Sequence, residues 1–281
     1  MRAKWEHMKG IRNNFINGYI EYILDGKKMR AKWEHIYKAW QIDGTLGAFR
    51  TMPKLATAHV DPQFIKKMKV SNCAQVLSRS VAVSINFMAI TGASIESNEG
   101  RIYMPAEGTE TTKFIHFCDE LFDSLNGSKQ SDAKKLKCRV SNNTEHIEFW
   151  RSAIKILETV KFIMKKGSTI PPTIKNFIIT LKNVMFLYQH MKKLGFSYMP
   201  TRAFNQDCLE FFFGKVRKGV RFTNPTAAVF VPFYKSFFVN NFINRHSSGN
   251  SCEDDNNHIL ATVDKLVKQV CEIFPTLIRI Y

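Results

Sequence analysis

The densest group of chemically capable side chains lies in residues 205–217, NQDCLEFFFGKVR. Asp207 and Glu210 are three residues apart, so a helix would place both carboxylates on one face, with Arg217 near that face two turns later. Two carboxylates on one face suit a divalent ion such as Mg²⁺, and metal ions suit phosphoryl chemistry. From spacing alone, an N-terminal cap formed by Asn205 or Asp207 is the better interpretation, because early acids also favour the helix dipole.

The common enzyme motifs are absent from the sequence. It has no GxxxxGK[ST] phosphate loop, no GxGxxG opening a helix, no HExxH and no GxSxG. Its six cysteines lack the close CxxC pairing typical of zinc sites, which favours reduced thiols. The polar cluster in 205–217 therefore has to be weighed with the rest of the chain.

The net charge indicates a polyanionic partner. The 281 residues include 41 Lys and Arg against 24 Asp and Glu, a formal charge of +17, and 44% hydrophobic residues suit a folded protein. We expect nucleic acid and no membrane. No basic amphipathic terminal helix stands out, and the apolar run 229–239 is too short and too interrupted to span a bilayer. The start of the chain has no signal-peptide pattern, which predicts an intracellular protein. A solvated basic surface without a partner is the alternative.

The elements that must position these residues are mainly helical. Apolar residues recur at helical spacing in several segments, while two segments suit extended structure and four suit loops. The predicted helices are 33–41, 114–125, 147–163, 174–194, 208–216 and 258–273; the extended segments are 52–60 and 101–105; the loops are 92–100, 127–135, 167–172 and 246–257. The heptapeptide MRAKWEH occurs at 1–7 and again at 29–35, which indicates a local duplication and no repeat architecture.

A series of short motifs resembles the P element-type DNA transposases and their THAP-domain relatives. The pattern NQDxLExxFxxxR of 205–217 is similar to a signature of that family. Seven further segments match in the same order along the chain. They are KGIRNN (9–14), PKL with HV (53–55 and 59–60), KMKVSNCAQVLS (67–78), FDSLNG (122–127), HIEFW (146–150), GFSYMPTR (195–202) and NPT (224–226). Together they are specific, although each alone would be weak.

This resemblance implies a mainly α fold, in which a helical GTP-binding insertion domain packs on the helical C-terminal remnant of an RNase H-like transposase domain. Residues 1–27 would be a remnant of an RNase H-like helix, and 28–165 the helical insertion. Residues 166–225 would be the C-terminal part of the RNase H-like domain. Residues 226–281 would form a helical tail with a polar loop at 246–257.

The resemblance also implies roles for single residues. Asp207 and Glu210 would bind Mg²⁺, with Glu210 as the last acid of the catalytic triad. A guanine edge presents N1–H and N2–H₂ donors, and a carboxylate such as that of Asp123 can accept both. The positions matching nucleotide contacts are Lys54, Lys69, Val70, Ser78, Asp123, Asn126 and Asp207. Taken alone, the two lysines suit a solvated surface, and Asp123 and Asn126 suit an Asn–Gly turn.

The catalytic triad departs from the family pattern. Aligned on the 9–14 motif, the position of the second acid falls at Ala3 and that of a following His at Glu6, both inside the duplicated heptapeptide. Asp25 and Asp43 lack the motif context. The chain also has no C2CH zinc module and no upstream strand for the first acid. Since two Mg²⁺ ions need three acids, we expect this chain not to cut DNA by itself.

Several functions therefore stay open. The first is a fragment or domesticated derivative of a P element-like transposase that binds GTP and transposon ends in the nucleus. It would assemble with itself or with a full-length transposase. The second is part of an active transposase whose other acids lie upstream. The third is a regulatory protein, and the fourth, independent of the resemblance, a basic helical nucleic-acid-binding protein.

Overall fold

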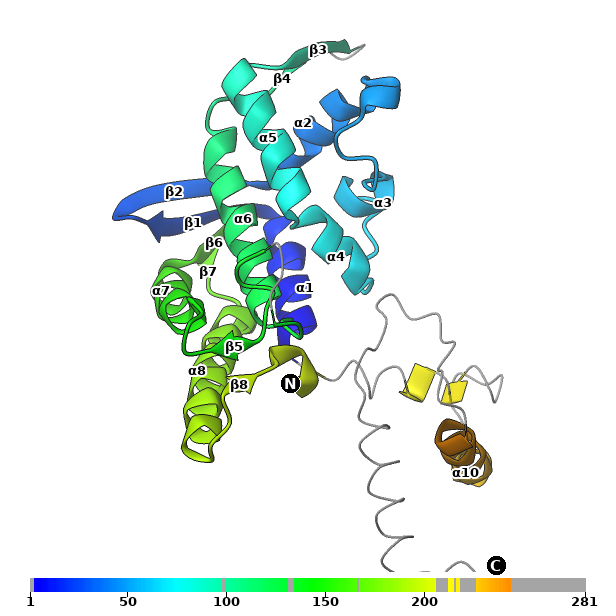
Figure 1. Ribbon diagram of the computed structural model, residues 1–281. Helices are drawn as coiled ribbons and strands as arrows, with labels where there is room; N and C mark the ends of the chain where they lie inside the picture. Colours follow the sequence, from blue (N-terminus) through cyan, green and yellow to red (C-terminus); the bar gives the residue numbers. More distant parts are fainter. Residues whose placement is uncertain are drawn as a thin grey trace, which may run out of the picture. The chain divides into compact units, whose positions relative to one another are not determined.

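The computed structural model describes residues 3–97, 100–130, 134–165, 167–205, 212–214, 216–217 and 226–243 (Figure 1). The chain divides into two compact units, Met1–Phe204 and Asn205–Tyr281, which we describe separately. The first unit is mostly helical and carries small antiparallel sheets.

Eight helices and eight short strands are seen in the described part of the first unit. The helices are α1 (Ala3–Phe15), α2 (Trp33–Gly44), α3 (Thr57–Val60), α4 (Val70–Val76), α5 (Arg79–Thr91), α6 (Gly108–Ser124), α7 (His146–Thr159) and α8 (Pro172–Lys193). The strands are β1 (Gly18–Leu24), β2 (Lys27–Lys32), β3 (Ser94–Ser97), β4 (Gly100–Tyr103), β5 (Val140–Ser141), β6 (Lys161–Met164), β7 (Gly167–Thr169) and β8 (Tyr198–Met199). Short 3₁₀ turns occupy Gly47–Phe49 and Thr201–Phe204.

Most of the predicted helices in this unit are confirmed. The segments 33–41, 114–125 and 174–194 correspond to α2, α6 and α8, and α8 starts at Pro172, as expected for proline in a first turn. The predicted helix 147–163 is too long, because α7 ends at Thr159 and the chain continues as strand β6. The extended structure predicted for 52–60 is wrong at its end, where α3 forms, whereas 101–105 does begin in strand β4.

A four-stranded antiparallel sheet in the order β2-β1-β6-β7 was not predicted. Strands β1 and β2 form a hairpin through Asp25 and Gly26, both of which have positive φ, as a tight two-residue hairpin requires. The pairing of β1 with β6 joins residues near 20 to residues near 162. The chain from α2 to α7 therefore leaves this sheet after β2 and returns to it at β6.

The two copies of MRAKWEH adopt different structures. In the first copy, Ala3–His7 belongs to helix α1, whereas the second copy forms most of strand β2 and the start of α2. In the second copy Met29, Ala31 and Trp33 are buried, which is the alternation expected for a strand. The surroundings of each copy, and not the heptapeptide, determine its secondary structure.

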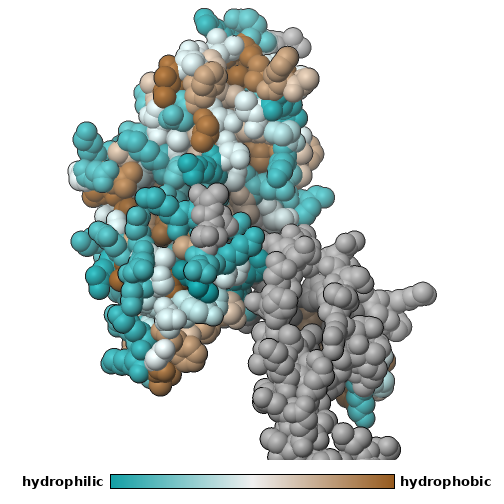
Figure 2. All heavy atoms as spheres, viewed as in Figure 1, coloured by the Kyte–Doolittle hydropathy of each residue, from teal (hydrophilic) through white to brown (hydrophobic). Residues whose placement is uncertain are grey.

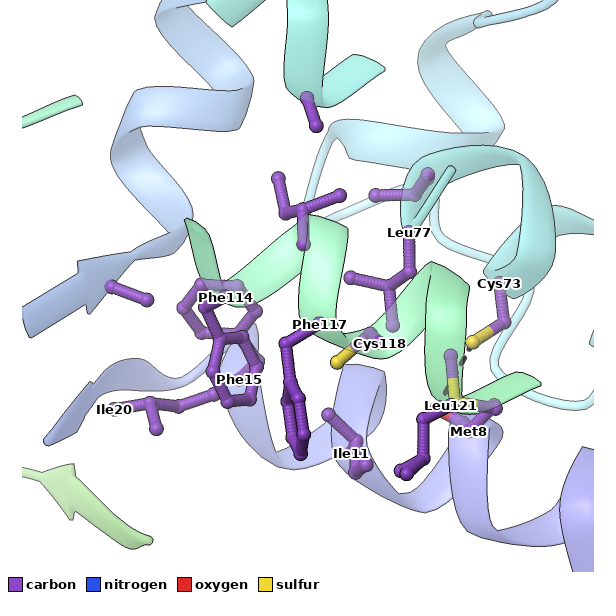
Figure 3. Close-up of a cluster of buried hydrophobic side chains, with 14 of the residues drawn as sticks. Met8, Ile11, Phe15, Ile20, Cys73, Leu77, Phe114, Phe117, Cys118 and Leu121 are labelled. Atoms are coloured by element: carbon purple, nitrogen blue, oxygen red, sulfur yellow. Dashed lines mark hydrogen bonds between the residues drawn. The ribbon is translucent and has the colours of Figure 1, made fainter. Parts of the chain in front are cut away.

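Helix α6 runs through the middle of the first unit beside α5 and α1 (Figure 1). Figure 3 shows Phe114, Phe117 and Cys118 of α6 packed among side chains of α1 and α4. By composition alone, Ser71–Thr91 is the one described segment long and apolar enough to cross a membrane. Half of its most apolar window is buried inside this unit, which fits its place in the core.

The surface of the first unit is polar over much of the face seen in Figure 2, and hydrophobic side chains gather near the end formed by α5, β3 and β4. Exposed hydrophobic residues of α5 include Val83, Phe87 and Ile90.

In the second unit, helix α10 spans Ala227–Ile243 and contains Pro232. Its Phe230 and Tyr234 form an aromatic cluster with Phe212 and Phe213, with ring centroids between 5.4 and 6.5 Å apart. Most of the predicted helix 208–216, and all of 258–273, lie outside the described residues.

Three buried histidines make the stability of the first unit depend on pH; burial lowers the pKa of His146 and, more strongly, those of His7 and His35. His7 contacts the hydroxyl of Thr180 at 3.1 Å and His35 that of Thr111 at 2.8 Å. Burial lowers the pKa of each of these two imidazoles from 6.5 to about 4. Between these pH values the unfolded chain binds protons that the folded chain does not. The free energy of unfolding should therefore fall as the pH drops below about 6.5, by about 1 kcal/mol for each of these two histidines at pH ~5.5.

Urea unfolding at pH ~7.5 and ~5.5 measures this effect, and His35→Gln should remove about 1 kcal/mol of the difference. An equal drop in parent and variant would show that His35 does not contribute.

Candidate functional site

The residues singled out from the sequence fall into two groups in the first unit. Lys54, Lys69 and Ser78 lie around α3 and α4, and Val70 is the first residue of α4. Asp123 and Asn126 lie at the C-terminal end of α6. Asp207 and Glu210 lie outside the described residues.

The motifs 9–14 and 67–78 meet through a buried arginine. Arg12 of α1 is fully buried, and its Nη2 donates hydrogen bonds to the carbonyls of Lys67 at 2.8 Å and Lys66 at 3.3 Å. The side chain of Asn13 accepts from Arg12 and donates to the carbonyl of Lys67. Burial is the main cause that lowers the pKa of Arg12. Its Nη1 is buried without a hydrogen-bond partner among the described residues.

The lysines of this first group point to solvent. Lys54, Lys66, Lys67 and Lys69 are exposed, and none of them forms an ion pair with a described residue. Ser78 is already engaged, because its hydroxyl donates to the carbonyl of Gln75 at 2.8 Å. The four lysines supply a concentration of positive charge suited to phosphate groups.

The second group is built around two buried carboxylates. Asp119 and Asp123 lie one turn apart on α6 and are only 9% and 5% exposed. The ammonium of Lys134 bridges them, at 2.9 Å from Asp119 and 2.5 Å from Asp123. Burial raises the pKa of Asp123, and Lys134 opposes that shift. Burial lowers the pKa of Lys134, but the two carboxylates outweigh it and raise the pKa overall. The sequence did not indicate Asp119 or Lys134, although both lie close to the FDSLNG motif.

Three of the sequence motifs converge on the turn that follows α6. The amide of Gly127 donates to the hydroxyl of Thr201 at 2.9 Å, and the amide of Arg202 donates to the carbonyl of Gly127 at 3.1 Å. The indole of Trp150 donates to the hydroxyl of Ser124 at 2.9 Å. Segments 122–127, 146–150 and 195–202 are therefore joined by hydrogen bonds, which fix the end of α6 with Asp123 and the following turn with Asn126.

A separate polar cavity of about 420 Å³ lies where strand β2 meets the start of α6. Lys28, Arg30 and Lys32 line it together with Glu107 and Glu110. None of the residues predicted to contact a nucleotide lines this cavity. Two of its three cations, Lys28 and Arg30, already form ion pairs with Glu21 of β1, so the two motif groups are the stronger candidates. Within the described part of the chain, no cluster of His, Cys, Asp and Glu is suited to a metal ion.

Comparison with known proteins identifies two matching regions of the chain, and both groups of residues in the first unit lie within the first of them. Residues 6–139 match the family described as TNP-like, GTP-binding insertion domain, and residues 203–235 match TNP-like, RNase H C-terminal domain. The Transposable element P transposase of Drosophila melanogaster is 25% identical over 231 residues, covering 79% of this chain and 28% of that protein. A solved structure, the Drosophila P element transposase strand transfer complex, superposes with a TM-score of 0.68 at 21% identity, covering 84% of this chain and 50% of that chain. This chain thus spans half or less of the length of these relatives.

Proposed function

Since this chain carries the GTP-binding insertion domain and the RNase H C-terminal domain of P element transposase-like proteins, we propose that it binds GTP and transposon DNA. It would do so as a fragment, or a domesticated derivative, of such a transposase. We further propose that it acts in the nucleus, and that it assembles with itself or with a full-length transposase.

The observation that carries this proposal is the buried carboxylate of Asp123 at the end of α6, where three family motifs are joined by hydrogen bonds. A carboxylate in a fixed position suits the two donors of a guanine edge, and burial strengthens such hydrogen bonds. Lys54 and Lys69 lack ion pairs among the described residues and suit the triphosphate. The ammonium of Lys134 forms an ion pair with the carboxylate of Asp123. A guanine base would therefore have to displace this ammonium or share the carboxylate with it.

Equilibrium titration of the purified chain with labelled GTP tests the proposal. We expect saturable binding that unlabelled GTP displaces and ATP does not, because the adenine edge lacks the N1–H and N2–H₂ donors. Equal displacement by ATP would contradict recognition of the base through Asp123.

We also predict that this chain alone does not cleave or join DNA. In this proposal Glu210 would supply one catalytic acid and Asp207 a second Mg²⁺ ligand, whereas two-metal chemistry needs three acids. Incubation of the chain with a transposon-end duplex and Mg²⁺ should leave the duplex intact. Mg²⁺-dependent cleavage that disappears in Glu210→Ala would overturn this prediction.

A non-catalytic, regulatory nucleic-acid-binding protein is the second candidate. The net charge of +17 and the four lysines without ion pairs around α3 and α4 favour it. This candidate predicts DNA binding without GTP binding, so the GTP titration separates the two.

A further inference from the structure

The segment between α3 and α4, residues 61–69, combines exposed apolar and basic side chains; we call it the basic loop. Phe64 is 61% exposed and Met68 is 79% exposed. Lys66, Lys67 and Lys69 are exposed beside them. Large apolar side chains held in water on one short loop, between cations, are typical of a surface that is covered by a partner.

The basic loop is held in place by hydrogen bonds and a buried anchor. The amides of Phe64 and Ile65 both donate to the carbonyl of Asp61 at 3.0 Å, and Ile65 itself is buried. The amide of Lys69 donates to the carbonyl of Lys66 at 3.0 Å. The buried guanidinium of Arg12 fixes the loop backbone by donating hydrogen bonds to the carbonyls of Lys66 and Lys67. Because the loop backbone is already ordered, binding a partner costs little conformational entropy of the loop.

The charge of the loop selects the class of partner. Asp61 is its one acid, and the carboxylate of Asp61 accepts from the loop's own Gln63 amide at 2.9 Å. The three lysines therefore face solvent without a nearby counter-charge from the loop. Phosphate groups complement lysines, and the faces of unpaired bases complement an aromatic ring and a flexible thioether.

We propose that the basic loop is a contact site for an unpaired nucleic-acid strand. Phe64 stacks on a base, Met68 packs beside it, and Lys66 and Lys67 neutralise the adjoining phosphates. A paired duplex hides its base faces, so an overhang or a frayed end is the preferred substrate. The inference rests on the proposed DNA binding and adds to it a site and a preference for unpaired bases.

The test compares binding of a blunt duplex with binding of the same duplex carrying a single-stranded overhang, by fluorescence anisotropy. Phe64→Ala should weaken binding of the overhang substrate about 5- to 100-fold and leave the blunt duplex nearly unchanged. Lys66→Ala and Lys67→Ala should weaken both and each reduce the salt dependence by about one released counterion. Phe186→Ala and Lys175→Ala, exposed residues of α8, are the matched controls and should change neither substrate.

The outcomes separate this inference from the proposed function. If the parent chain binds neither substrate, the proposed DNA binding itself fails. If the parent binds but Phe64→Ala matches Phe186→Ala, or weakens both substrates equally, the basic loop does not read unpaired bases. All these side chains are exposed, so thermal unfolding of each variant should match that of the parent.

Discussion

Replacing Asp123 with asparagine is expected to move the nucleotide preference of this chain from GTP to xanthosine triphosphate. Asparagine presents an NH₂ group that repels the N2–H₂ of guanine but donates to the O2 of xanthine. The loss of a charged acceptor costs about 1.5–3 kcal/mol, so GTP affinity should fall ~10- to 100-fold. Competition of both nucleotides against labelled GTP or xanthosine triphosphate measures the exchange.

A matched control comes from the same helix. Asp119 shares Lys134 with Asp123 and is similarly buried, so Asp119→Asn makes the same chemical change one turn away. It should alter affinity without inverting the preference. A variant Asp123→Asn that still prefers GTP would contradict guanine recognition by this carboxylate, whereas a gain of xanthosine triphosphate binding cannot come from misfolding.

Replacing Gly127 with alanine should destabilise the first unit by about 3 kcal/mol or more. A Cβ atom at this position would lie 1.8 Å from the carbonyl oxygen of Cys138, which is backbone and has little freedom to shift. The next residue, Arg139, donates its amide to Lys129 at 2.8 Å, and strand β5 follows immediately, paired with β8. The turn after α6, next to Asp123, would have to open, so nucleotide binding should be lost as well.

The midpoint of urea unfolding measures this destabilisation. Gly44→Ala is the control, because a Cβ atom there meets nothing within 4 Å and Gly44 ends helix α2 without a positive φ. Its unfolding free energy should stay within about 0.5 kcal/mol of the parent. If Gly127→Ala unfolds at the same urea concentration as Gly44→Ala, the close packing of this turn is not essential.

The helices with strong periodicity were predictable from the sequence, and the sheet as a whole was not. In α6, apolar residues such as Phe114, Phe117 and Leu121 repeat at helical spacing and are all buried. Strands β1 and β2 flank Asp25–Gly26, a dipeptide typical of tight hairpins, so this pair was predictable but was missed. The pairing of β1 with β6 joins residues 140 or more positions apart, which no local signal indicates. Strand β6 follows α7 after a single residue, which explains why the predicted helix ran on to 163.

The candidate site was predictable only through the family motifs. Asp123 and Asn126 were found because FDSLNG resembles the family, whereas composition favoured an ordinary turn. Lys134 was not predicted, because it meets Asp119 and Asp123 only when the segment between α6 and β5 folds back onto α6. Arg12 lies within a matched motif, but its contact with the basic loop joins residues 54 and 55 positions apart, which no local pattern reveals.

Hydrogen exchange of the parent chain with and without saturating GTP tests the central claim most directly. Bound GTP should slow the exchange of backbone amides in two regions, the end of α6 with the turn after it and the segment from the basic loop through α4. ATP at the same concentration should protect neither. Protection confined to β2 and the start of α6, around Lys28 and Glu110, would place the nucleotide in the polar cavity and contradict the account, as would the absence of any GTP-dependent protection.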